Sequence, residues 1–111
     1  MRRGDIYTAA TGGGYGGKPR PVLVLQGNDF CGFPRIIVAL FATPRSELAW
    51  PRLLIEPSPR NGLDQVSELQ IDILMTVPVR KFGKRLGCLE DEYFHRADAT
   101  ILTFLGFNGR P

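Results

Sequence analysis

The chain has 111 residues, a formal net charge of +3 and 43% hydrophobic residues. This length suits a single domain spanning residues 1–111, and the composition is ordinary for a folded protein. No apolar run approaches the roughly 20 residues of a membrane span, and the first residues lack an apolar signal segment, so we expect a cytoplasmic protein with no membrane partner. With only two cysteines and one histidine, the usual zinc sites are excluded, and we predict no metal and no cofactor.

The predicted elements are short strands followed by one helix. Apolar or alternating segments between Gly and Pro turns predict strands at residues 4–10, 21–26, 35–43, 52–56, 65–77 and 86–89. After Leu89 the apolar period becomes helical, through Phe94, Ala97, Ile101 and Leu105, which predicts a helix over residues 90–107 that packs on the sheet. The pattern favours a mainly β fold with α, a small β-barrel of about six or seven strands plus a C-terminal helix.

The glycine-rich segment TGGGYGGKPRPVLVLQ, residues 11–26, matches two nucleotide-binding patterns by spacing alone. Its glycines fit a dinucleotide-binding turn, and together with Lys18 they fit most of a P-loop. Both loops require a helix directly after the glycines, whereas here a Pro-Arg-Pro sequence and a strand follow, so we exclude both. Two interpretations remain open: a flexible hairpin connection, or a flap over a groove in which Tyr15 stacks on a base.

Arg20 lies between two prolines that restrict the backbone at the mouth of a predicted strand. An arginine held in this way suits contact with a phosphate, and the alternative is a surface salt bridge. Other basic residues form local clusters that favour a polyanion partner or, more simply, a solvated face. The candidates for such contacts are Lys18, Arg45, Arg80 and Lys81.

Three segments in order carry a resemblance to a known family. MRRGDIY with the following glycine-rich loop, then PRPVLVLQGNDF, then IDILMTVPVRKFGKRLGCL resemble the MazF/PemK family of type II toxin–antitoxin ribonucleases. The resemblance implies an SH3-like barrel, a homodimer, and metal-independent, sequence-selective cleavage of single-stranded RNA. Attack of a ribose 2′-OH on the adjacent phosphate would leave a cyclic phosphate and a free 5′-OH. It also implies neutralisation by a cognate antitoxin through a partly disordered segment.

The resemblance assigns roles to individual residues. Arg20 matches the catalytic arginine of the family and would contact the scissile phosphate in bidentate fashion. Thr43 or Ser46 would supply a hydroxyl to the phosphate, although Thr43 could simply end a strand. Asp72 matches an acidic residue that is a general base in some members and structural in others. Gln70, on the same face as Asp72, stands where certain members carry an arginine, and we expect it to contact RNA.

Three further points follow from the residues present. The only histidine, His95, lies on the predicted helix, so a two-histidine mechanism is impossible and we interpret it as a surface residue. Because no arginine stands at position 70, a non-catalytic RNA-binding barrel stays open as an alternative. A CcdB-like gyrase-inhibiting toxin, with the same barrel and no nuclease activity, is another.

Overall fold

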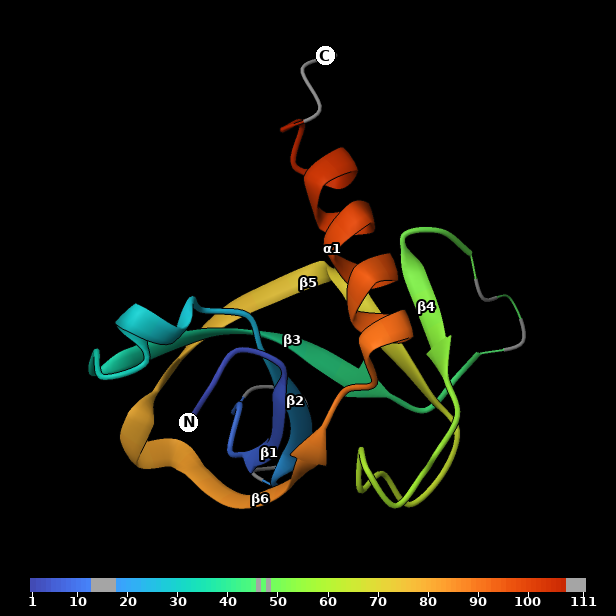
Figure 1. Cartoon of the computed structure of the whole chain (residues 1–111). Coiled ribbons are helices and arrows are strands. Elements are labelled where there is room, and N and C mark those ends of the chain that lie inside the picture. The colour runs from blue at the N-terminus through green and yellow to red at the C-terminus, as the bar shows by residue number, and fades with distance from the viewer. Residues whose placement is uncertain (13–17, 46, 48, 108–111) are drawn as a thin grey trace.

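The computed structural model describes residues 1–12, 18–45, 47 and 49–107. Within these residues the chain forms six strands, two short 3-10 turns and one C-terminal α-helix (Figure 1). The predicted mainly β fold with a terminal helix is confirmed. The elements are β1 (Asp5–Ala9), β2 (Arg20–Val24), η2 (Asn28–Phe30), β3 (Arg35–Ala42), β4 (Arg52–Ile55), β5 (Ser67–Pro78), η3 (Val79–Lys81), β6 (Phe82–Cys88) and α1 (Asp91–Phe104).

All six strands belong to one antiparallel sheet in the order β4-β5-β3-β2-β1-β6. The long strand β5 bends, and the sheet curls so that β6 passes across the side where β1 and β2 lie (Figure 1). Within the described residues, the two edge strands β4 and β6 do not pair with each other. The expected barrel is therefore a coiled six-stranded sheet that stays open between its edges.

The last strand begins earlier than the sequence pattern predicts. β6 starts at Phe82, four residues before the predicted start at 86, and pairs with β1 through Ala9 opposite Phe82 and Tyr7 opposite Arg85. Its first half is largely exposed, and register shifts interrupt its pairing with β1. A glycine and two cations on an exposed edge show no apolar alternation, which is why this half-strand escapes a search for that pattern.

The helix ends sooner than predicted, at Phe104 instead of residue 107. Gly106 adopts a positive φ of 83°, and its N–H donates to the carbonyl of Thr103 at 3.1 Å, while the Phe107 N–H donates to the carbonyl of Leu102 at 2.8 Å. These two bonds form a Schellman motif, which glycine allows because it has no Cβ. No helix in the described part of the chain is long and apolar enough to cross a membrane.

Each face of the sheet carries its own apolar cluster, as period-2 alternation requires. On the helix side, Leu23, Phe41, Leu69 and Ile71 pack with Ala97 of α1. The second cluster lies on the opposite face and is covered by the curl of the sheet itself, because late β5 and early β6 pack against it. It comprises Ala9, Val22, Val24, Ile36, Val38, Leu40 and Val77, with Ile73, Met75 and Phe82 at its margin.

Candidate functional site

A pocket of about 190 Å³ opens where β2 begins and β3 ends. Because the two strands are antiparallel neighbours, the first residue of β2 and the residue after β3 reach the same rim. The pocket therefore brings together Arg20 and Thr43, as the sequence predicts. Its lining residues are Pro19, Arg20, Pro21, Phe41, Ala42, Thr43, Gly62, Leu63, Asp64, Gln65, Ser67 and Leu86.

Arg20 is half-buried and its backbone position is well defined. It is the first residue of β2, pairs with Ala9 of β1, and has prolines on both sides that fix the local φ angles. Thr43 follows the end of β3 and is exposed. A guanidinium on a restricted backbone and the hydroxyl of an exposed threonine thus border one cavity, and these are the groups that phosphate oxygens accept hydrogen bonds from.

The opposite wall of the pocket comes from the connection between β4 and β5, which sequence analysis interprets only as a turn. Asn61 is completely buried and organises this connection. Its Oδ1 accepts hydrogen bonds from the N–H groups of Ser58 and Leu63 at 3.0 Å each, and its Nδ2 donates to the Glu56 carbonyl at 2.9 Å. The Asn61 amide also donates to Oε1 of Glu90 at 3.1 Å, which ties the connection to the residue preceding α1.

The same connection lies directly on β6. Gly62 has a φ of +70°, and a Cβ at this position would collide with the backbone carbonyl oxygen of Leu86. The Cys88 N–H donates to the Arg60 carbonyl at 2.9 Å. Only glycine permits both the positive φ and the close approach at position 62. These contacts hold the pocket wall against the sheet edge.

This wall contributes polar residues that sequence analysis misses. Asp64 and Gln65 are exposed and line the pocket, and Ser67 at the start of β5 lines it from below. Asp64 is the only carboxylate among the lining residues. The sequence indicates these lining residues only weakly, through a short polar run after the Asn61-Gly62 turn.

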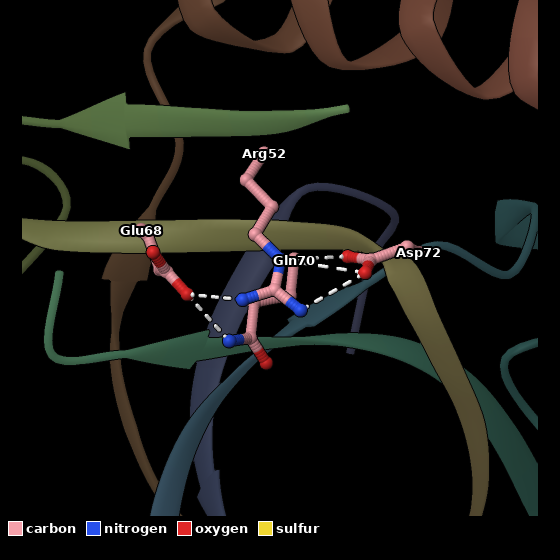
Figure 2. Close-up of polar contacts among 4 residues, drawn as sticks. All are labelled: Arg52, Glu68, Gln70 and Asp72. Carbon is pink, nitrogen blue, oxygen red and sulfur yellow. Dashed lines mark hydrogen bonds and ion pairs between the residues drawn. The ribbon is translucent and has the colours of Figure 1, made fainter. Parts of the chain in front are cut away.

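Asp72 and Gln70 do not line this pocket but belong to a second polar cluster, the Arg52 network, formed by Arg52, Glu68, Gln70 and Asp72. Figure 2 shows the Arg52 guanidinium between the two carboxylates. Arg52 donates from Nε to Asp72 Oδ1 at 3.1 Å, from Nη2 to Asp72 Oδ2 at 2.9 Å, and from Nη1 to Glu68 Oε2 at 2.9 Å. The Gln70 amide donates to the same Glu68 oxygen at 2.6 Å.

The network sets the electrostatics of this strand. The hydrogen bonds that Arg52 donates hold the pKa of Asp72 below its ordinary value despite the opposing effect of burial, and the same bonds raise the pKa of Arg52. Glu68 is only 1% exposed, so its charge depends on Arg52 and Gln70 for compensation. Because the Glu68 carboxylate binds the NH₂ of Gln70, the amide oxygen of Gln70 points elsewhere, and this buried atom has no hydrogen-bond partner within the described residues.

Strand register places the Arg52 network beside the pocket. Glu68 lies opposite Ala42, which lines the pocket, and Arg52 lies opposite Gln70. Cα atoms of such pairs are about 4.5–5.5 Å apart. Arg52 thus places a guanidinium opposite the position at which the sequence lacks an arginine, and Glu68 and Asp72 compensate its charge.

The remaining predicted residues are distributed around the sheet. Lys18 and Arg45 are exposed and stand two residues from Arg20 and Thr43 respectively. Arg80 borders a separate pocket with Arg35. The carbonyl of Lys81 accepts the Ala10 N–H at 3.0 Å, which places Lys81 at the end of β1 next to the start of the glycine-rich segment.

Two predicted residues, Tyr15 and Ser46, lie outside the described residues. His95 is exposed on α1, in agreement with its interpretation as a surface residue. In the described part of the chain, no group of three or more His, Cys, Asp or Glu residues is arranged to hold a metal ion.

Comparison with known proteins agrees with the observed fold. Residues 2–105 match the family described as PemK-like, MazF-like toxin of type II toxin-antitoxin system. The chain is 45% identical to a probable endoribonuclease MazF of Mycolicibacterium smegmatis over 109 residues, which cover 98% of this chain and all of the relative. Toxin MazF-mt6 of Mycobacterium tuberculosis has 25% identity and a TM-score of 0.75, with 91% of this chain and 95% of that chain covered. A mycobacterial endoribonuclease solved with its cognate antitoxin has 20% identity and a TM-score of 0.81, with 100% and 99% covered.

Proposed function

The chain belongs to the PemK-like, MazF-like family of type II toxin–antitoxin toxins and is an endoribonuclease, and we propose that it cuts single-stranded RNA in the pocket of Arg20 and Thr43. The observation that carries the proposal is the convergence of a guanidinium, a hydroxyl and a carboxylate on one cavity. The lining residues include neither histidine nor cysteine, so the chemistry rests on these three groups.

The proposed reaction is attack of a ribose 2′-OH on the adjacent phosphorus. A P–O bond forms to the 2′-oxygen, the bond to the 5′-oxygen breaks, and the products are a 2′,3′-cyclic phosphate and a 5′-hydroxyl that takes up a proton. Negative charge grows on the phosphoryl oxygens in the transition state, and Arg20 would stabilise it by bidentate contact. Thr43 would donate a hydrogen bond to the same phosphate. No step requires a metal ion.

Two carboxylates are candidates for accepting the 2′-OH proton. Asp64 lines the pocket and its carboxylate is exposed there. Asp72 binds Arg52 through both oxygens, and the resulting fall in its pKa makes it a weaker base. We therefore propose Asp64 as the acceptor and Asp72 as the group that positions Arg52, with Asp72 as base the second candidate.

Basic residues that lie near the pocket in sequence or through strand pairing extend the proposed site. Lys18, Arg45 and Lys81 would contact the phosphates that flank the cut, and Gln70 would contact a base. Arg80 lies farther along, beside Arg35. Tyr15 and Ser46, which lie outside the described residues, would stack on a base and contact a phosphate, as proposed from the sequence.

We also propose the partners and the compartment that the family implies. A structural neighbour was solved with its cognate antitoxin, and two others are MazE–MazF complexes from Deinococcus radiodurans, which supports an antitoxin partner for this chain. A homodimer, neutralisation by a partly disordered antitoxin segment, and action on mRNA in the cytoplasm complete the proposal.

The decisive experiment compares wild type with Arg20→Ala on single-stranded RNA in the presence of EDTA. We expect wild type to give discrete cuts with cyclic phosphate ends, and Arg20→Ala to lose at least 100-fold in single-turnover rate, roughly the effect of removing one transition-state donor. Arg96→Ala, which removes an exposed arginine from α1, is the matched control and should cut normally. Undiminished cutting by a folded Arg20→Ala protein would remove Arg20 from the mechanism.

The proton acceptor is tested separately with Asp64→Asn and Asp72→Asn. If Asp64 is the base, Asp64→Asn loses the acidic limb of the pH–rate profile, because the group that must be ionised is gone. Asp72→Asn would then lower the rate but keep that limb. The opposite pattern would assign the base to Asp72.

A further inference from the structure

A third pocket, of about 280 Å³, lies where the start of β1, the end of β6 and the start of α1 meet. Four of its ten lining residues are arginines: Arg2, Arg3, Arg60 and Arg85. Two carboxylates, Asp5 and Asp91, also line it. No part of the proposed cleavage reaction uses this arginine pocket.

One of the four arginines is structural. Arg3 donates to both oxygens of Asp98, at 2.6 and 3.3 Å, and to the Leu25 carbonyl at 2.8 Å, and its guanidinium lies 4.6 Å from the centre of the Phe94 ring. Asp98 is not among the lining residues of the pocket, and it compensates the charge of Arg3. Arg3 therefore has little capacity left for a ligand.

The other three arginines are available to an anion. Arg60 binds Asp91 at 2.9 Å and Arg85 binds Asp5 at 3.2 Å, each through a single nitrogen, and both arginine side chains are about half exposed, at 49% and 51%. An exposed pair such as Arg60–Asp91 contributes little stability, whereas Arg85 pairs with the mostly buried Asp5. The side chain of Arg2 is exposed and has no ion pair within the described residues. Three positive and two negative charges leave an excess of one, which matches the single charge of one phosphodiester.

The arginine pocket shares a wall with the Arg20 pocket. Arg85 lines the first and the next residue, Leu86, lines the second, while Arg60 and Gly62 do the same from the connection between β4 and β5. Because consecutive Cα atoms are about 3.8 Å apart, the two pockets lie next to each other along β6 and along the connection between β4 and β5.

We propose that Arg2, Arg60 and Arg85 form a phosphate subsite for the RNA strand, binding a phosphodiester that flanks the one held at Arg20. The subsite rests on the proposed function for its ligand, but its anion chemistry rests only on the pocket. Its contribution is to affinity and to the direction in which RNA lies, because phosphate contacts position a strand without reading its sequence.

The test measures RNA affinity against salt concentration with a cleavage-resistant strand that carries 2′-O-methyl ribose throughout. The variant is Arg2→Ala/Arg60→Ala, which spares Arg85 and thus the buried Asp5 that Arg85 pairs with. Loss of one phosphate contact on a single strand should reduce the magnitude of the slope of log K against log salt by about 0.7. Arg2→Ala alone, at an unpaired exposed position, should give part of this change without affecting folding. The control Arg96→Ala should leave the slope unchanged. A wild-type slope in the double variant would overturn the proposal.

A second arm separates RNA from free anions. Inorganic phosphate is titrated at constant ionic strength while the backbone amides of Gly4 and Leu89, which line the pocket, are followed by NMR. Phosphate-induced shifts that vanish in Arg2→Ala/Arg60→Ala support the anion site. Such shifts together with an unchanged RNA slope would identify a site for free phosphate only and overturn the RNA subsite. Because this arm and the slope need no cleavage, they are independent of whether Arg20→Ala abolishes cutting.

Discussion

The Arg52 network makes a sharp prediction about stability, because one member of it is buried and charged. Replacing Arg52 with methionine keeps an unbranched side chain of similar length but removes the guanidinium. Glu68, with 1% of its side chain exposed, then loses its cationic partner and, within the described residues, keeps the hydrogen bond from the Gln70 amide. Breaking a fully buried ion pair in this way costs about 3–5 kcal/mol. Because Arg52 is 25% exposed and water can partly replace it, we expect about 2–3 kcal/mol for Arg52→Met.

Replacing the other partner of the ion pair, Glu68, should destabilise the protein less. Glu68→Gln removes the buried charge, and Arg52 keeps its two hydrogen bonds to Asp72, so we expect about 1 kcal/mol. The double variant Arg52→Met/Glu68→Gln contains no buried uncompensated charge at this position. It should therefore be more stable than Arg52→Met alone by about 1–2 kcal/mol.

Urea unfolding of the four proteins at pH 7, followed by circular dichroism, measures these differences as shifts of the midpoint at constant m. Two results would refute the reasoning. One is an Arg52→Met protein within about 0.5 kcal/mol of wild type, the usual range for a surface substitution. The other is a double variant no more stable than Arg52→Met, since this would mean that the buried charge of Glu68 is not what Arg52 compensates.

Two further predictions concern the wall of the Arg20 pocket. Gly62→Ala should destabilise the protein by at least about 2 kcal/mol and abolish cutting, because a Cβ at a positive φ is strained and would push the wall away from the Leu86 carbonyl. Thermal melting measures the stability. The matched control is Gly32→Ala, where a Cβ meets nothing within 4 Å, and it should be close to neutral. Burial opposes ionisation of Glu90, but hydrogen bonds from Ser58, its own backbone and Asn61 outweigh it and hold the Glu90 pKa below its ordinary value of 4.5. The stability that this carboxylate contributes is present above that value and is lost as pH falls through the lower, folded-state pKa. Glu90→Gln should therefore flatten the acidic limb of a plot of unfolding free energy against pH. An unchanged limb would contradict a stabilising role for ionised Glu90.

Much of the fold can be read from local patterns. Leu69 and Ile71 alternate with Glu68, Gln70 and Asp72, and the structure places the two sets on opposite faces of β5 as that alternation requires. The first half of β6 escapes the same rule, because on an exposed edge strand neither set is apolar. For the strands that are buried on both faces, the sequence predicts the element and misses only one or two residues at its ends.

In the candidate site, too, some residues could be predicted from the sequence and others could not. Arg20 and Thr43 come together because antiparallel pairing of two consecutive strands joins the start of one to the end of the other, and the family resemblance already assigned both residues to contact with one phosphate. The places of Arg52 and Asp64 in the structure could not be predicted in this way. Arg52 meets Asp72 only because β4 pairs with β5 in a particular register, and many registers are compatible with the same alternation.

By itself, the sequence of this protein determined its class of fold, which faces of its strands are apolar, the C-terminal helix, and the position of Arg20 at the start of β2. Each of these depends on residues within a few positions of one another, where steric and hydrophobic preferences act without help from the rest of the chain. Only the tertiary structure decided that Asp64 and Arg20 line one pocket, that Asp72 is held by Arg52, and that four arginines line another pocket. These meetings join residues from 20 to more than 80 positions apart, and they depend on register and on close backbone contacts such as that of Gly62 with β6.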